Sequence, residues 1–61
     1  MKSIVDVLMR RDGMTREDAE QLVADCKVDL YDAIENGDFM YADDICQSWF
    51  GLDSDYMMEL L

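Results

Sequence analysis

Three glycines divide a chain that contains no proline, and their positions limit what the chain can fold into more than any other feature. Gly13, Gly37 and Gly51 each end a segment in which apolar residues recur with helical spacing. Glycine commonly follows the last turn of a helix, because it adopts a left-handed backbone without steric cost. Ser3 and Thr15, each followed three residues later by Asp, have the pattern of helix N-caps. The sequence therefore predicts four helices, over residues 3–12, 15–36, 39–50 and 54–61.

The segment 15–36 has the clearest helical pattern. Its apolar residues follow the spacing of one helix face, whereas acidic residues occupy much of the rest. This face is made of Ala19, Leu22, Val23, Cys26, Leu30, Ala33 and Ile34. The shorter helices offer smaller apolar faces, made of Ile4, Val5, Leu8 and Met9, of Ala42, Ile45, Cys46 and Trp49, and of Tyr56, Met57, Leu60 and Leu61.

The predicted turns between helices are very short, which favours antiparallel or steeply crossed neighbours. We therefore expect a single all-α domain over residues 1–61. Its architecture would be a compact bundle of three to four short helices. The long central helix, residues 15–36, would carry the other helices on its apolar stripe.

Charge is distributed unevenly along the chain. The net charge is −10, from 15 acidic and 5 basic residues. The first 27 residues hold all five bases and six acids, whereas the rest of the chain holds nine acids and no base. Direct binding to nucleic acid or to an anionic membrane surface is disfavoured, because both draw on cationic side chains. A basic protein surface is the natural complement of this charge.

The residue types that support catalysis or metal binding are scarce. The chain has no histidine, and Cys26 and Cys46 do not form a C-x-x-C motif, so we expect no zinc site and two reduced thiols. Asp53 and Asp55 begin like a calcium-binding loop, but methionines stand where the loop needs its third oxygen ligand and its glycine. A chain of this length has little volume for a cleft that shifts a pKa. We therefore expect neither an enzyme nor a cofactor.

No stretch of the sequence has the length of an apolar membrane span. The apolar run near the N-terminus is interrupted by Asp6, Arg10 and Arg11, which a signal peptide would not contain. We expect a cytoplasmic protein that does not enter the membrane.

Two groups of residues are candidates for contacting a partner. Acidic residues recur at Asp25, Asp29 and Asp32, and again at Asp43 and Asp44. They are either a solvated outer face or a row of charges that imitates a phosphate backbone.

The second group is aromatic. Large apolar residues crowd the chain after residue 38, and they surround their helices, so they cannot all face inward together with Trp49. We expect some of them to be exposed or buried in an interface. Phe39, Tyr41 and Phe50 would be the apolar anchors of such a contact.

The segment from Leu8 to Ala19, together with Asn36-Gly37-Asp38-Phe39 and Gly51-Leu52, resembles short acidic proteins encoded by bacteriophages and prophages. The resemblance covers nearly the whole chain, but its motifs mark helix ends and transfer no functional residues. It implies a context, since small acidic phage proteins often inhibit host defence or regulatory proteins by binding them.

Three functions are compatible with these features. The leading hypothesis is a protein-binding module of the phage-inhibitor type that occludes a basic, nucleic-acid-binding surface of a host protein. One alternative is a self-associating homodimer with a two-fold interface of aromatic and Met residues. The other is an acidic antitoxin or regulatory adaptor that neutralises a basic partner. A DNA reader of the helix-turn-helix type is disfavoured, because residues 39–50 contain no base.

Overall fold

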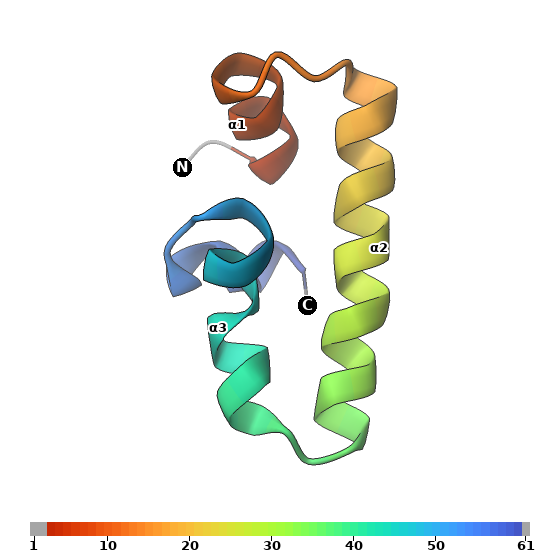
Figure 1. The fold of residues 1–61 in the computed structure, drawn as a ribbon, viewed down its shortest axis with the longest axis vertical. Coiled ribbons are helices and arrows are strands. Elements are labelled where there is room, and N and C mark those ends of the chain that lie inside the picture. Colours follow the sequence, from red (N-terminus) through yellow and green to blue (C-terminus); the bar gives the residue numbers. More distant parts are fainter. Residues whose placement is uncertain (1–2, 61) are drawn as a thin grey trace.

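The computed structural model describes residues 3–60, and these residues form four helical elements without strands (Figure 1). The elements are α1 (Ile4–Arg11), α2 (Arg16–Glu35), α3 (Phe39–Phe50) and η1, a 3₁₀ helix (Ser54–Glu59). The expected all-α fold class is confirmed. The three predicted α-helices lie within one residue of the observed bounds at each end, whereas the fourth element has the tighter 3₁₀ geometry. We expected Leu61 to belong to the apolar face of this last helix, but it lies outside the described residues.

Each α-helix begins at a side chain that accepts a hydrogen bond from a free backbone N–H of the first turn. The hydroxyl oxygens of Ser3 and Thr15 each accept one from the N–H three residues later, both at 3.1 Å. The Asp38 carboxylate does the same at the start of α3, at 3.3 Å. These are the predicted caps at Ser3 and Thr15, and a cap of this kind stabilises a helix by about 1 kcal/mol.

The ends of the helices, like their starts, are set by residues close by in the sequence. All three glycines have positive φ, between 67° and 77°. After Gly37, the Asp38 N–H donates to the Ala33 carbonyl at 2.8 Å, which is the bond that spans six residues in a Schellman turn. The hydrophobic residues that follow the other two glycines, Met14 and Leu52, pack against the core as such turns favour.

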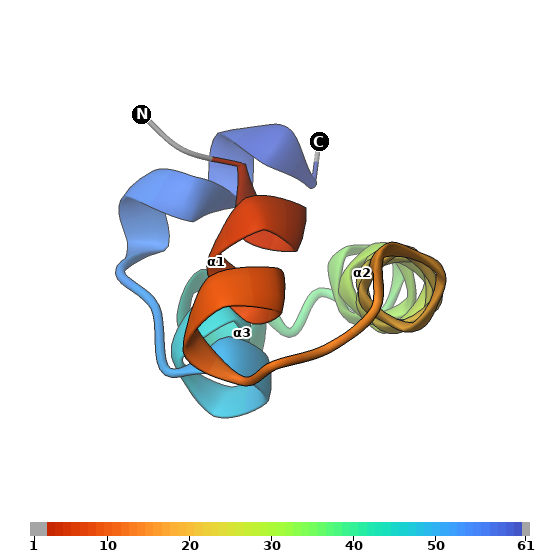
Figure 2. The same ribbon diagram turned by 90° about the horizontal axis from the view of Figure 1, so that it is seen from above.

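α2 is the spine of the molecule. Seen from above, α1, α3 and η1 all lie to one side of it (Figure 2). α1 packs beside its N-terminal half, and α3 returns antiparallel beside its C-terminal half (Figure 1).

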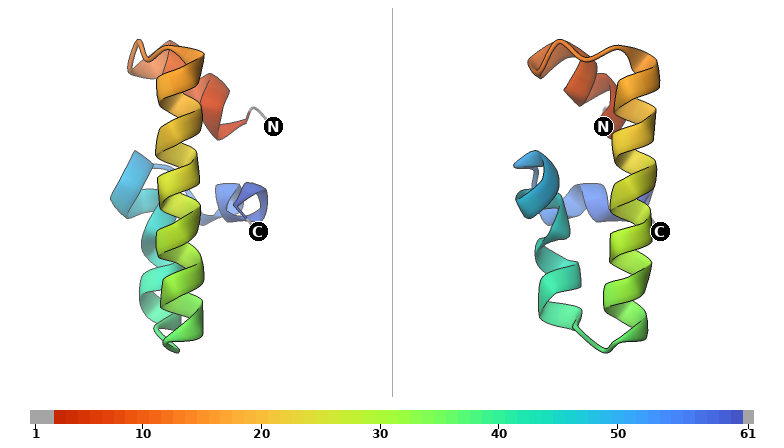
Figure 3. Two further views of the ribbon diagram at one scale, coloured as in Figure 1. Left: turned by 90° about the vertical axis from the view of Figure 1, so that its right-hand side faces the viewer. Right: turned by 45° about the vertical axis from the view of Figure 1, so that its right-hand side comes forward.

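The fourth element does not dock where we expected. η1 runs crosswise near the middle of α2 but packs mainly on α3, so the expectation that it would lie on the stripe of α2 is wrong (Figure 3). The turn at residues 51–53 is too short to carry the chain away from the end of α3 before η1 begins. Just after η1, the Leu60 carbonyl accepts a hydrogen bond from the Tyr31 hydroxyl of α2 at 3.2 Å.

The core lies between α2 and the elements on its one covered side. It consists of Ile4, Leu8, Ala19, Cys26, Leu30, Ala33, Ala42, Ile45, Cys46, Phe50 and Leu60. The predicted apolar faces are buried or pack against the core in most positions, whereas Ile34 is 37% exposed. Their half-buried members are Val5, Met9, Leu22, Val23, Trp49, Tyr56 and Met57.

Candidate partner-binding surface

Asp29 joins α2 to α3. Its Oδ2 atom accepts a hydrogen bond from the Tyr41 hydroxyl and another from Trp49 Nε1, the latter at 3.1 Å. The carboxylate is half-buried, and the bond to it raises the pKa of the Tyr41 hydroxyl. The sequence pattern places Asp29 in a solvated row, so its part in holding two helices together is a finding of the structure.

Asp25 and Asp32 lie one helical turn before and after Asp29, and both are exposed. The Asp25 carboxylate accepts a hydrogen bond from Gln21 Nε2 at 3.0 Å, within the same helix. Because positions three and four apart share one side of a helix, the three carboxylates follow the edge of α2 that meets α3.

α3 adds a further carboxylate to this edge. Asp44 is exposed, lies one turn after Tyr41, and accepts a hydrogen bond from Ser48 Oγ at 3.3 Å. Since Tyr41 contacts Asp29, Asp44 flanks the same line of contact between the two helices. We call the group Asp25, Asp29, Asp32 and Asp44 the acidic seam.

Asp43 is exposed but does not belong to the acidic seam. Successive residues of an α-helix point about 100° apart, so Asp43 and Asp44 face different sides of α3. The five acids expected to act together therefore divide into a group of four and one residue beside it.

The three predicted aromatic anchors have different surroundings. Phe39 is 62% exposed, whereas Tyr41 is half-buried and bonded to Asp29. Phe50 is only 3% exposed, so the expectation that it would anchor a partner is wrong. It lies four residues after Cys46 and eight after Ala42, on the buried stripe of α3. Met40, which the predicted anchors did not include, is 88% exposed.

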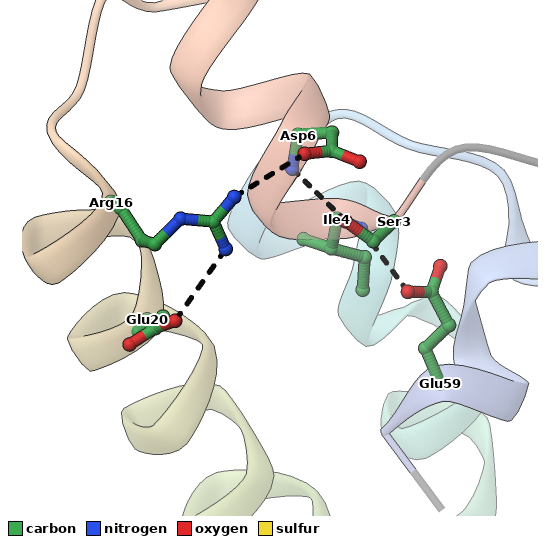
Figure 4. Close-up of polar contacts among 6 residues, drawn as sticks. All are labelled: Ser3, Ile4, Asp6, Arg16, Glu20 and Glu59. Atoms are coloured by element: carbon green, nitrogen blue, oxygen red, sulfur yellow. Dashed lines mark hydrogen bonds and ion pairs between the residues drawn. The ribbon is translucent and has the colours of Figure 1, made fainter.

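Helix α1 is held to α2 and to η1 by polar contacts (Figure 4). Arg16 pairs with Asp6 of α1 at 4.0 Å and with Glu20 of α2 at 3.7 Å. The Ile4 N–H donates to Glu59 Oε1 at 3.2 Å, which ties the first turn of α1 to η1. The Arg16 guanidinium is thus paired with acids of α1 and of the first turns of α2, and not with an acid of α3.

In the described part of the chain we find no pocket, no metal-binding group of three or more ligands, and no helix long and apolar enough to cross a membrane. No protein-family model, curated protein or solved structure is significantly similar to the chain.

Proposed function

We propose that the chain is a small protein-binding module that presents the acidic seam to a basic surface of another protein. The observation that carries this proposal is Asp29, which the hydrogen bonds of Tyr41 and Trp49 hold where α2 meets α3. Exposed acids lie one turn from these contacts, Asp25 and Asp32 beside Asp29 on α2 and Asp44 after Tyr41 on α3. Three of the four seam carboxylates, Asp29, Asp32 and Asp44, lie in the part of the sequence from Val28 onward, which contains no base. Charge of one sign gathered on one side attracts and orients a partner of the opposite sign.

The context that we propose is inhibition. Carboxylates spaced along the seam would stand in for the phosphates of a nucleic acid and occupy the groove of a host protein that binds one. The resemblance to small acidic phage proteins supports this context, and the net charge of −10 favours association with a basic groove. Occlusion of this kind requires no catalytic group on the inhibitor.

A matched pair of triple variants tests the acidic seam. One variant carries Asp25→Asn, Asp32→Asn and Asp44→Asn, and the other removes three exposed acids elsewhere through Glu17→Gln, Asp53→Asn and Asp55→Asn. Both lose three negative charges. Asp29 is left intact in both, because its loss would loosen the helix pair as well as remove a charge.

A basic protein captured from bacterial lysate and then purified provides the binding assay, with duplex DNA as a competitor. We expect the seam variant to bind at least about tenfold more weakly and the control variant to bind almost as tightly as the parent. Affinity of the parent should fall steeply between about 0.05 and 0.3 M salt. Equal losses in both variants, or binding that ignores salt, would contradict the proposal.

A further inference from the structure

At one end of the molecule, α2 and α3 extend past the other described elements (Figures 1 and 3). The turn between α2 and α3, with the last turns of α2 and the first turns of α3, projects beyond both α1 and η1 (Figures 1 and 3). The rest of the α2–α3 pair is covered on one side by those two elements.

The apolar stripes of both helices continue into this uncovered end. Ile34 lies one turn after Leu30 on α2, and Phe39 lies two turns before Cys46 on α3. Leu30 and Cys46 are buried, whereas Ile34 is 37% exposed and Phe39 is 62% exposed. The two residues therefore lie on sides of the helices that are buried elsewhere, at a level where no further described element covers them.

Exposed acids flank these two apolar residues along the chain and on α3. Glu35 follows Ile34, Asp38 precedes Phe39, and Asp43 lies one turn after Phe39 on α3, and all three are exposed. No base lies in this part of the sequence. An occupant that buries the apolar pair must therefore bring positive charge to the acids around it.

We propose that the uncovered end receives a basic amphipathic helix of the partner protein, whose apolar stripe packs on Ile34 and Phe39. Its Lys and Arg side chains lie against Glu35, Asp38 and Asp43. An added helix at this level would complete the layer that α1 and η1 form elsewhere, as amphipathic helices do when they bind another protein. This inference rests on the proposed function and specifies the partner's structure.

A second copy of this chain is a poor occupant of the same site. It would set the acids of one copy against those of the other, and each copy carries a net charge of −10. Like charges placed opposite each other across an interface oppose association. A purely apolar helix would leave the acids without partners.

Two synthetic peptides of equal charge separate the apolar contact from electrostatic attraction. The first is a Leu/Lys peptide of about 18 residues with its leucines on one helix face, a length that suits helix formation on binding. The second replaces every Leu by Gln and keeps all the lysines. Binding is measured by calorimetry, and the contact is located by the amide shifts of the ¹⁵N-labelled protein.

Phe39→Ala is the test variant, and Val28→Ala is its control. Val28 is 70% exposed on α2 and lies two residues before Leu30, which places it on the opposite side of the helix. Both substitutions remove exposed apolar surface, and circular dichroism checks that both variants fold. We expect the Leu/Lys peptide to bind the parent at least about tenfold more tightly than the Gln/Lys peptide. Phe39→Ala should weaken binding of the Leu/Lys peptide by at least about tenfold, and Val28→Ala should weaken it by less than about twofold.

Several outcomes would overturn the inference. Equal binding of the two peptides would overturn it, because electrostatic attraction alone would then account for the affinity. That result would not contradict the proposed function. Failure of the Leu/Lys peptide to bind would also overturn the inference, as would binding that is insensitive to Phe39→Ala. So would sedimentation of a dimer that Phe39→Ala dissociates, because a second copy would then occupy the site. Failure of the proposed function itself shows separately, as equal losses in the two triple variants.

Discussion

The backbone N–H of Ile4 donates a hydrogen bond to the side chain of Glu59, 55 residues away along the chain. Ile4 is the first residue of α1, where four N–H groups have no partner within the helix. Ser3 accepts from one of them, and Glu59 accepts from another. A carboxylate at this position also interacts favourably with the positive end of the helix dipole. η1 therefore supplies a hydrogen-bond acceptor to the first turn of α1.

Replacing Glu59 by Ala should destabilise the protein by about 1 kcal/mol, because the N–H of Ile4 loses its acceptor. Glu59→Gln should cost less, since its side-chain oxygen still accepts while the charge is gone. Urea unfolding followed by circular dichroism measures both. Asp55→Ala, at an exposed acid of the same element, is the control. Equal effects of Ala at positions 55 and 59 would show that the contact with Ile4 contributes nothing specific.

Asp29→Ala should loosen the contact between α2 and α3. Two donors, the Tyr41 hydroxyl and the Trp49 indole N–H, lose their shared acceptor. We expect a loss of about 1–2 kcal/mol, a large fraction of the stability available to so short a chain. The melting temperature should fall. The fluorescence of Trp49, which reports on the surroundings of its indole ring, should change as well. Asp25→Ala, one turn away and exposed, should stay within about 0.5 kcal/mol of the parent. Similar losses at both positions would contradict a structural role for Asp29.

The helix bounds could be predicted from the sequence because the signals that set them are local. Ser3 and Thr15 bind N–H groups three residues away, and the three glycines adopt their left-handed conformation at the turns. The burial of Phe50 could also have been found, since it continues the spacing of Ala42 and Cys46. The crowding of large residues after residue 38 pointed to exposure instead.

The contacts of Asp29 and η1 could not be predicted in the same way. The sequence pattern alone indicates that Asp29, beside the apolar stripe of α2, is solvated. The donors that bind it, Tyr41 and Trp49, are 12 and 20 residues away and belong to a neighbouring helix. The exposure of Phe39 likewise depends on the packing of η1, which does not reach the turn between α2 and α3 (Figure 1). In each case the residue's role is set by how the helices pack, which the pattern of any one helix does not contain.

The two cysteine thiols should be unreactive in the folded protein. Cys26 and Cys46 are buried, and burial raises the pKa of both thiols, that of Cys26 to about 11. The thiolate is the nucleophile, so at about pH 8 neither its charge state nor its access favours reaction. We expect both thiols to react with a disulfide reagent at the rate of unfolding, and rapidly in denaturant. Fast reaction of either thiol without denaturant would show that the core around α2 and α3 opens readily.

Stability should fall as the pH rises from about 9 to about 11. In the unfolded chain the Cys26 thiol ionises near its ordinary pKa of 9.0, whereas in the folded protein burial holds its pKa at about 11. The unfolded state therefore binds fewer protons in this window, and the free energy of unfolding decreases with pH. The loss from Cys26 should approach about 2–3 kcal/mol by the end of the window. Tyr41, whose pKa the bond to Asp29 raises, shifts stability in the same direction. Urea unfolding at several pH values measures the slope, and Cys26→Ala should make it shallower than in the parent. An unchanged slope in that variant would show that the buried thiol does not control the loss.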